Sequence, residues 1–417
     1  MVDIANSLLS QFPNPEHPYI AHSIASHWKA CQAWSLYYLS EKINNTLKFR
    51  LGKKHSDHIQ WEPNCPIVYA TIREFTDWIN DEVKDASNPF AKYPKELWWA
   101  YADYIYMSQL DEFQALINDL AFQQLFPFLP SDIIKPTFWL GSSRAHTICH
   151  RDTYGVNLVV QINGTKRWLL FPPSDNLYMY ESRIPLEEST VFSKVNFPVP
   201  NFKKYPLLTK ATPYCVTLHP GDILYVPRHW WHFVESTTTT TTTTTSSSNY
   251  TCSVNLWIDQ PSLDNRIRFK EGLTQLVGFS LLSNCCNRSV VSKDVLHPTE
   301  LKAFETESWF KELLDQLGLI YGENSFKLCN GNKEEEEGKG VKRSKIYPTI
   351  DWKPLISEKL DNLFPYLKEM KPTEAEDFAS SNNMTINRLS IEQILNAFMK
   401  PDVIDLVAKH LENDVIE

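Results

Sequence analysis

The sequence predicts a mainly β protein: a double-stranded β-helix (jelly-roll, cupin-like) barrel with flanking helices and a helical C-terminal region. Three observations favour this class. Between residues 137 and 260, short apolar runs of strand length alternate with turn residues. Two of the turns, Asn163-Gly164 and Pro220-Gly221, are typical of reversals between strands. On either side, apolar residues recur at spacings of three and four, as on a helix face. Many short strands of this kind are typical of a barrel.

The composition bounds the class of protein. The chain has 417 residues, 42 % of them hydrophobic and 13 % aromatic, which is ample for a packed core. Its net charge of -9 disfavours a nucleic-acid partner. The eight cysteines form no C-x-x-C pair, so we expect reduced thiols in the cytoplasm or nucleus. We expect no signal peptide and no membrane span, because no long apolar run occurs.

Residues 1–130 are predicted to form the N-terminal part of the fold. Residues 23–43 space apolar and aromatic side chains as an amphipathic helix does. Residues 47–54 read as a strand, and residues 72–85 and 116–126 as further helices.

Residues 131–260 are predicted to form the barrel. Two strands flank Asn163-Gly164, two more flank Pro220-Gly221, and "YTCSVNLWID" is a final strand. Residues 237–248 are threonines and serines only, which we interpret as a disordered loop because such a tract specifies no core.

Residues 261–417 are predicted to form a helical C-terminal region. A charged, glycine-containing linker is expected at about 330–345. The helices are expected to pack on the barrel or to form a homodimer interface. They are predicted at residues 265–282, 307–320, 355–370 and 390–412.

A metal site is predicted at the stretch "HTICHRD". On a strand, residues two apart share a face, so His150 and Asp152 project side by side. Inside a barrel an unpaired carboxylate is costly, and a divalent cation would relieve that cost. The alternative is that His150 and Asp152 form a surface or salt-bridged pair that binds no metal. A third ligand must come from another strand, and we favour His232 over His229, which follows Pro227 within a turn. Two histidines and a carboxylate form the facial triad of non-haem Fe(II) oxygenases.

Lys166, which is close to the Asn163-Gly164 turn, is a candidate anion ligand. If Asn163-Gly164 is a two-residue hairpin loop, Gln161 pairs with Lys166 and Val159 with Trp168. The partners share a face, which also holds Asn157 and Leu170. A lysine among such residues has a reason to be there if it binds a carboxylate. The alternative is a lysine that extends along the sheet rim.

The two candidate groups lie on strand positions of opposite parity. His150 and Asp152 are even-numbered, whereas Asn157 is odd-numbered. Both can face inward only if the alternation slips by one, and Gly155 is the easiest place for a bulge or turn.

These residues resemble the JmjC-domain family of Fe(II)- and 2-oxoglutarate-dependent oxygenases. The resemblance rests on "FWLGSSRAHTICHRDTYGVNLVVQINGTKRWLLFPP", "VTLHPGDILYVPRHWWHFVES" and "VNLWID", and extends upstream to about residue 15. Within the family it is greatest to the small JmjC-only proteins, which include a heat-shock-protein-associated type and an asparaginyl hydroxylase type. The resemblance implies Fe(II) as the metal, 2-oxoglutarate as co-substrate and dioxygen as oxidant.

The resemblance also assigns roles to individual residues. It makes His150, Asp152 and His232 the iron ligands. Lys166 and Thr147 would bind the distal carboxylate of 2-oxoglutarate, with Tyr106, or alternatively Tyr104, as a second hydroxyl donor. Asn157 and Asn255 would contact the metal-binding end of the co-substrate. The asparaginyl hydroxylase pattern has one residue fewer between the aspartate and the first asparagine, which is the same slip noted above.

The implied activity is hydroxylation of a protein side chain, with a protein or peptide as substrate. A histone demethylase is less expected because the sequence has no Cys/His zinc pattern, and a tRNA hydroxylase remains a minor alternative. The competing class is a catalytically silent barrel that acts as a protein-interaction module. The intact His-x-Asp, the distant histidine and the lysine favour the enzyme.

Overall fold

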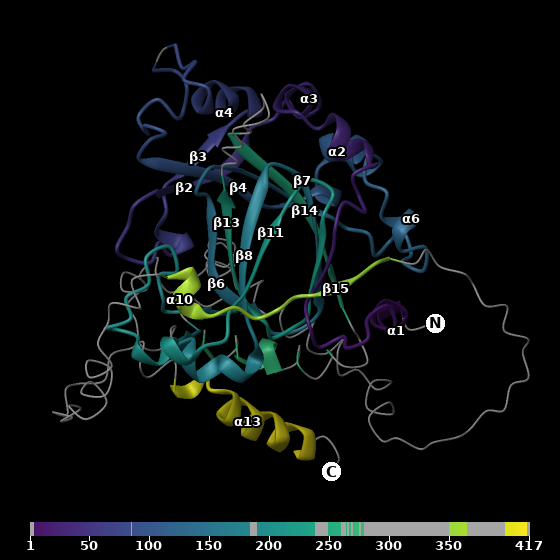
Figure 1. Ribbon diagram of the computed structural model, residues 1–417, viewed down its shortest axis with the longest axis vertical. Coiled ribbons are helices and arrows are strands. Elements are labelled where there is room, and N and C mark those ends of the chain that lie inside the picture. Colours follow the sequence, from purple (N-terminus) through teal and green to yellow (C-terminus); the bar gives the residue numbers. More distant parts are fainter. Residues whose placement is uncertain are drawn as a thin grey trace, which may run out of the picture.

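A barrel of two antiparallel sheets forms the centre of the computed structural model (Figure 1). The structure describes residues 4–84, 86–183, 190–237, 249–259, 350–364 and 397–414, with separate positions between 264 and 278. The two antiparallel sheets form a cupin-like jelly roll, as the sequence predicts.

The larger sheet has nine strands and the smaller has six. In spatial order the larger sheet contains β15 (Lys353–Pro354), β1 (Tyr19–Ala21), β12 (Ile223–Val226), β7 (Val156–Asn163), β14 (Tyr250–Ile258), β5 (Thr137–Ser142), β4 (Trp98–Tyr106), β2 (Leu47–Lys53) and β3 (Ile67–Ala70). The smaller sheet contains β11 (Tyr214–Leu218), β8 (Thr165–Phe171), β13 (Trp231–Thr237), β6 (His146–Asp152), β10 (Thr190–Ser193) and β9 (Glu181–Ser182).

The predicted hairpin at Asn163-Gly164 is wrong. The turn exists, with Gly164 at φ +64°, but it carries the chain from β7 in one sheet to β8 in the other. β7 pairs with β12 and β14, while β8 pairs with β11 and β13, so the pairs predicted across the turn do not form. Val159 and Trp168 nevertheless meet in the interior, because they face each other from opposite sheets.

The helices of the N-terminal part are shorter than the sequence predicts. The helix predicted at residues 23–43 is two helices, α2 (Lys29–Ala33) and α3 (Leu36–Lys42). Between them Ser35 is extended, and its side chain accepts a hydrogen bond from the Tyr38 amide as an N-cap. The predicted strand at 47–54 is confirmed as β2. The helix predicted at 72–85 ends early, as α4 (Ile72–Ile79).

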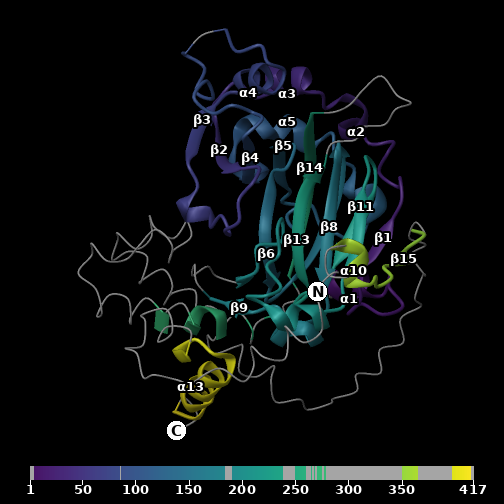
Figure 2. The same cartoon turned by 60° about the vertical axis from the view of Figure 1, so that its left-hand side comes forward.

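The remaining elements of this part are short. The helix predicted at 116–126 is divided into α5 (Gln114–Ile117) and α6 (Phe122–Leu125). Between them the Asp119 carboxylate accepts hydrogen bonds from Lys29, Trp34 and Tyr38, which ties the segment to α2 and α3. α3 and α4 lie at one end of the barrel (Figures 1 and 2). The other short helices of this part are α1 (Ile4–Leu9) and the 3-10 helices Glu62–Asn64, Met107–Gln109 and Asp111–Phe113. The 3-10 helices Pro173–Tyr178 and Pro206–Lys210 lie further along the chain, between barrel strands.

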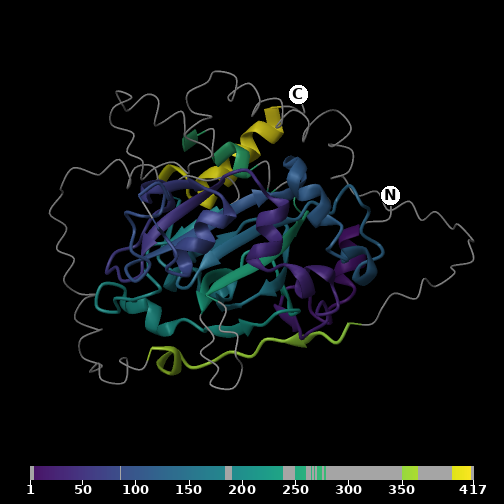
Figure 3. The same ribbon diagram turned by 90° about the horizontal axis from the view of Figure 1, so that it is seen from above.

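Part of the C-terminal region lies against the barrel as an extended strap, residues 350–364. β15 extends the larger sheet beside β1, and Ser357 forms a β-bridge with Tyr214 of β11 in the smaller sheet. Only α10 (Leu360–Leu363) is helical here, within the helix predicted at 355–370. Figure 3 shows the strap on one side of the molecule and α13 (Pro401–Asp414) on the other.

Several expectations fall on residues that the structure does not describe. These are the threonine tract from residue 238, the linker at 330–345 and the helix at 307–320. The boundaries at residues 130 and 260 stay predictions. The five cysteines within the described residues are free thiols. In the same part of the chain, no helix has the length and apolar character needed to cross a membrane.

Candidate metal centre and co-substrate pocket

A cavity of about 340 Å³ lies inside the barrel and is lined by strands of both sheets. Every residue predicted for the site lines it: His150, Asp152, His232, Thr147, Lys166, Asn157, Asn255 and Tyr106, together with Tyr104. Their roles as ligands remain predictions, but the structure places all of these residues around one cavity.

His150, Asp152 and His232 form one group of possible metal ligands. β6 carries the first two and β13 the third, and the register places His232 directly opposite His150. One ligand atom from each residue lies within 4.8 Å of the others. The His150 Nε2 and Asp152 Oδ1 atoms are 3.7 Å apart. The three side chains can therefore hold one cation between them.

Backbone carbonyls fix both imidazole rings. The Nδ1 of His150 lies 2.8 Å from the Ile148 carbonyl, and the Nδ1 of His232 lies 3.0 Å from the Trp230 carbonyl. A carbonyl can only accept, so each Nδ1 is the donor, and Nε2 is the ring nitrogen left to face a metal. Burial, and then the neighbouring His150, lower the pKa of His232 to about 4, so its ring is neutral at pH 7. Neutral imidazole is the form that binds a metal.

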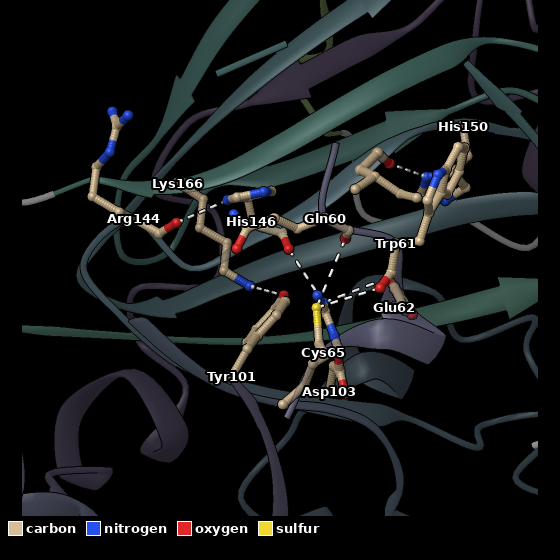
Figure 4. Close-up of polar contacts among 12 residues, drawn as sticks. Gln60, Trp61, Glu62, Cys65, Tyr101, Asp103, Arg144, His146, His150 and Lys166 are labelled. Atoms are coloured by element: carbon tan, nitrogen blue, oxygen red, sulfur yellow. Dashed lines mark hydrogen bonds and ion pairs between the residues drawn. The ribbon is translucent and has the colours of Figure 1, made fainter. Parts of the chain in front are cut away.

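The two histidines that were left out of the predicted site have other partners. His229 has φ +68°, and its amide donates to the Asp152 carbonyl at 2.7 Å, so it supports the backbone of a ligand. The Nδ1 of His146 donates to the Arg144 carbonyl (Figure 4). Its ring contacts that of Trp99, and neither residue lines the cavity.

A β-bulge in β6 explains how Thr147 reaches the cavity. Thr147 and His150 are three residues apart, so simple alternation would place them on opposite faces. Val234 pairs with Thr147 and His232 with His150, and the register shifts between these two pairs. The extra residue turns both side chains inward. Cys149 packs instead in the cluster outside the smaller sheet.

Lys166 lies at the inner end of the cavity. Its Nζ donates to the Tyr101 hydroxyl at 3.0 Å and to the Ser253 hydroxyl at 2.8 Å. Figure 4 shows Lys166 and Tyr101 pointing toward each other. Among the described residues, no carboxylate forms an ion pair with this lysine. Burial lowers the pKa of Lys166 to about 7. A buried amine with hydroxyl partners and one remaining donor is suited to bind an anion.

Tyr101 is a site residue that the sequence analysis missed. Thr147 also forms a hydrogen bond with its hydroxyl, whereas Tyr106 is 43 % exposed. Tyr101, Tyr104 and Tyr106 all line the cavity, because β4 has a register shift between Ala102 and Ile105. Strand alternation alone places Tyr104 and Tyr106 on one face of β4 and Tyr101 on the other. Only the position of the register shift in β4 could have identified Tyr101.

A buried ionic group supports Tyr101 from behind. The Arg50 Nε donates to Asp103 at 2.7 Å, and its Nη2 lies 3.4 Å from Glu62. The Arg50 guanidinium lies 5.8 Å from the centre of the Tyr101 ring. Figure 4 labels Tyr101 and the two carboxylate residues, Asp103 and Glu62. This packing holds the tyrosine in place against the lysine.

Asn157 and Asn255 are linked beside the metal ligands. Asn255 donates from its side-chain nitrogen to Asn157 at 2.9 Å and accepts from the Trp139 indole at 2.7 Å. The chain crosses between sheets from Asp152 to Val156, with Gly155 at φ +72°. Even-numbered residues (His150 and Asp152) face the cavity before this crossing, and an odd-numbered one (Asn157) faces it afterwards. The change occurs around Gly155, where the sequence predicts it.

The donor set fits a divalent iron ion. Two imidazoles and one carboxylate offer three ligands, which leaves three positions of an octahedral ion open for other molecules. Both imidazoles are held by second hydrogen bonds, as is usual for metal-binding histidines. The lysine and hydroxyl groups occupy the same cavity at a separate point.

Comparison with known proteins supports this description. A family model described as "Cupin-like domain" matches residues 5–264. The chain is 34 % identical over 376 residues to the HSPB1-associated protein 1 homolog of Danio rerio, covering 88 % of this chain and 78 % of that protein. It is 38 % identical over 290 residues to HSPB1-associated protein 1 of Homo sapiens, covering 69 % of this chain and 56 % of that protein.

A more distant match is the Jumonji C domain-containing protein 5 of Drosophila melanogaster, 28 % identical over 229 residues, which are 52 % of this chain and 51 % of that protein. The match therefore spans only about half the length of the human and fly relatives. The family model covers more than half of this chain, including every ligand candidate described above. The chain belongs to the cupin-like JmjC domain family, which includes 2-oxoglutarate oxygenases.

Proposed function

We propose that the protein is an Fe(II)- and 2-oxoglutarate-dependent dioxygenase that hydroxylates a protein side chain. One observation carries the proposal: a single cavity holds a His-Asp-His group and a buried lysine whose partners are hydroxyl groups. The first fits a divalent metal and the second fits the carboxylate of a dicarboxylic acid.

The cavity residues have different expected roles in the reaction. Bound iron, together with the co-substrate, supplies the activation of dioxygen and the oxidation of a C–H bond. Lys166, Tyr101 and Thr147 would hold the distal carboxylate. Asn157 and Asn255 would orient the end of the co-substrate nearest the metal. Trp168 stacks on His232 and would shield that side of a bound metal from water.

The test is an anaerobic titration with Fe(II) and 2-oxoglutarate, following the weak visible charge-transfer band that forms when both bind. The folded wild-type protein should give the band, and His150→Ala should not. Absence of the band in wild-type protein that is folded by circular dichroism would overturn the proposal.

The same titration separates the two tyrosine assignments. Tyr101→Phe removes a hydroxyl that contacts Lys166, so the co-substrate affinity should fall by about tenfold. Tyr106→Phe serves as the matched control, and its effect should stay below about twofold, because that residue is 43 % exposed. The reverse order of effects would favour the original assignment of Tyr106.

A protein is the favoured substrate or partner. Relatives of this chain carry the name HSPB1-associated protein 1, which describes association with another protein. The acidic net charge also disfavours RNA. Cytoplasmic or nuclear location and a homodimer formed through the C-terminal helices remain part of the proposal.

The second candidate function is a catalytically silent interaction module, which that same name favours. The two functions differ in one measurable product. An enzyme releases succinate when a suitable peptide is added, whereas a silent barrel binds the peptide and releases none.

A further inference from the structure

We infer that Arg50, Asp103 and Glu62 are positioning residues for the co-substrate, which set the place and the charge of the groups that bind its distal carboxylate. The inference rests on the proposed function and deepens it. None of the three residues lines the cavity, so they do not touch the bound acid and act through residues that do.

Burial makes this ionic group costly if stability is its only purpose. The side chains of Arg50, Glu62 and Asp103 are 2 %, 3 % and 6 % exposed. Removing charges from water is unfavourable, and their mutual attraction offsets that cost only with good geometry. Apolar side chains of similar volume often give equal or greater stability at such positions. A role in the adjacent cavity gives the chain a reason to keep the charges.

The first contact of the group with the co-substrate site is the ring of Tyr101. Arg50 extends from β2, and its Nε donates to Asp103 of β4 at 2.7 Å. Its Nη2 lies 3.4 Å from Glu62. The two carboxylates fix the guanidinium beside the rings of Trp99 and Tyr101, at 5.2 Å and 5.8 Å from their centres. The tyrosine ring therefore has a fixed neighbour that lies outside the cavity.

The second contact is with the strand that carries Thr147. The Nη2 of Arg50 donates to the carbonyl of His146 at 3.2 Å, directly before Thr147 in β6. This is the part of β6 where the bulge turns Thr147 toward the cavity. Thr147 also forms a hydrogen bond with the Tyr101 hydroxyl. One guanidinium therefore fixes both hydroxyl groups that the proposed function assigns to the distal carboxylate.

The charge of the group acts on Lys166. Among the described residues, the titratable groups that act on this lysine are the Tyr101 hydroxyl and the Asp103 carboxylate of β4 and the Cys252 thiol of β14. Burial raises the pKa of the hydroxyl and the pKa of the thiol, so both are neutral at pH 7. Burial also raises the pKa of Asp103, but Arg50 opposes this change and stabilises the carboxylate. Asp103 is therefore the negative charge that favours the protonated lysine.

Two simpler roles for the group give different expectations. If it only stabilises the fold, its loss lowers the stability of the barrel and leaves the pocket unchanged in protein that is folded. If it is itself a binding site, its residues should line the cavity, and they do not. A positioning role predicts that the affinity for the co-substrate and the pH dependence of that affinity both change in folded protein.

The experiment measures the 2-oxoglutarate affinity of the full-length, Fe(II)-loaded protein by the anaerobic charge-transfer titration, repeated across neutral pH. Asp103→Asn keeps the shape of the side chain and removes its charge. The rise of the dissociation constant with pH should begin about one unit lower than in the wild type, because Lys166 loses the carboxylate that favours its cation. At pH 7 the dissociation constant should therefore be at least about fivefold higher.

Two further variants separate position from charge. Arg50→Lys keeps the cation but loses the planar contacts, so the affinity should fall by about threefold or more at every pH, with no shift of the pH profile. The triple variant Arg50→Met, Asp103→Asn, Glu62→Gln removes all three charges together, so no unpaired charge remains to unfold the protein. It should bind the co-substrate at least about fivefold more weakly than the wild type.

Asp119→Asn is the matched control. This carboxylate is also buried and accepts hydrogen bonds from three side chains, but it does not line the cavity. Its loss should lower the stability of the protein and change the co-substrate affinity by less than about twofold.

The outcomes separate the two proposals. Absence of the band in folded wild-type protein overturns the proposed function. The variants are then compared by calorimetry with succinate and metal-free protein, which needs only the carboxylate end of the pocket. The inference is overturned if the folded variants bind the acid as the wild type does, if Asp119→Asn weakens binding as much as Asp103→Asn, or if the wild type binds neither acid.

Discussion

At the scale of single residues, Lys166 is the group whose charge state decides what the cavity binds. Burial lowers the pKa of Lys166 to about 7, well below the ordinary lysine value of 10.5. Below pH 7 the amine is a cation, and above it the neutral form increases. A bound carboxylate pairs with the cation alone, so binding above pH 7 must take up a proton.

This linkage predicts the pH dependence of co-substrate affinity. The dissociation constant of 2-oxoglutarate should increase as the pH rises from about 7 to about 9, approaching tenfold per unit. The anaerobic titration, repeated across this range, measures it. Lys166→Arg keeps its charge at every pH in the range and should lose most of the dependence. A wild-type affinity that does not change with pH would contradict the assigned role of the lysine.

The residues of the site differ in whether the nearby sequence is enough to identify them. His150 and Asp152 could be found because residues two apart on a strand share a face. Lys166 could be found only through the resemblance, because the hairpin that predicted its direction does not form. Tyr101 could not be found, because its direction depends on a register shift in β4 that local sequence does not specify. Thr147 was found through the resemblance alone, since the bulge in β6 contradicts simple alternation.

At the scale of elements, the strands were predictable and their partners were not. The turn at Gly164 was recognised, but a turn does not say whether the chain stays in its sheet. That choice depends on pairings with β12, β13 and β14, which come from residues far along the chain. The helix predicted over residues 23–43 failed for a related reason: the Asp119 carboxylate and the Ser35 cap favour two short helices.

Gly164 makes the crossing between the sheets sensitive to substitution. Its φ is +64°, and an added Cβ would collide with the backbone carbonyl of Tyr250. Gly164→Ala should therefore lower the free energy of unfolding by about 2–3 kcal/mol, measured by urea denaturation. Gly155→Ala is the matched control: its φ is +72°, but the nearest atom is 3.3 Å away, so about 1 kcal/mol is expected. Equal losses would show that strain, not collision, dominates.

At the scale of the whole molecule, the strap joins the two sheets at their open edges. Its backbone pairs with β1 in one sheet and bridges to β11 in the other. Its side chains reach both cores: Leu355 packs in the cluster that contains Trp168, and Leu360 and Phe364 pack in the cluster outside the smaller sheet. The matched family segment ends at residue 264, so this closure comes from outside it.

The strap should therefore contribute to the stability of the barrel that holds the site. Leu355→Ala and Phe364→Ala each remove a side chain that is 8 % exposed, and each should lower the free energy of unfolding by about 2–4 kcal/mol. Ile356→Ala, adjacent in sequence but 80 % exposed, should change it by less than about 0.5 kcal/mol. Urea denaturation followed by tryptophan fluorescence measures all three. If the strap only rests on a finished barrel, the three variants will unfold alike. If it closes the edges, the two core variants will unfold at lower urea, and the charge-transfer band of the metal site will be lost at the same urea concentration.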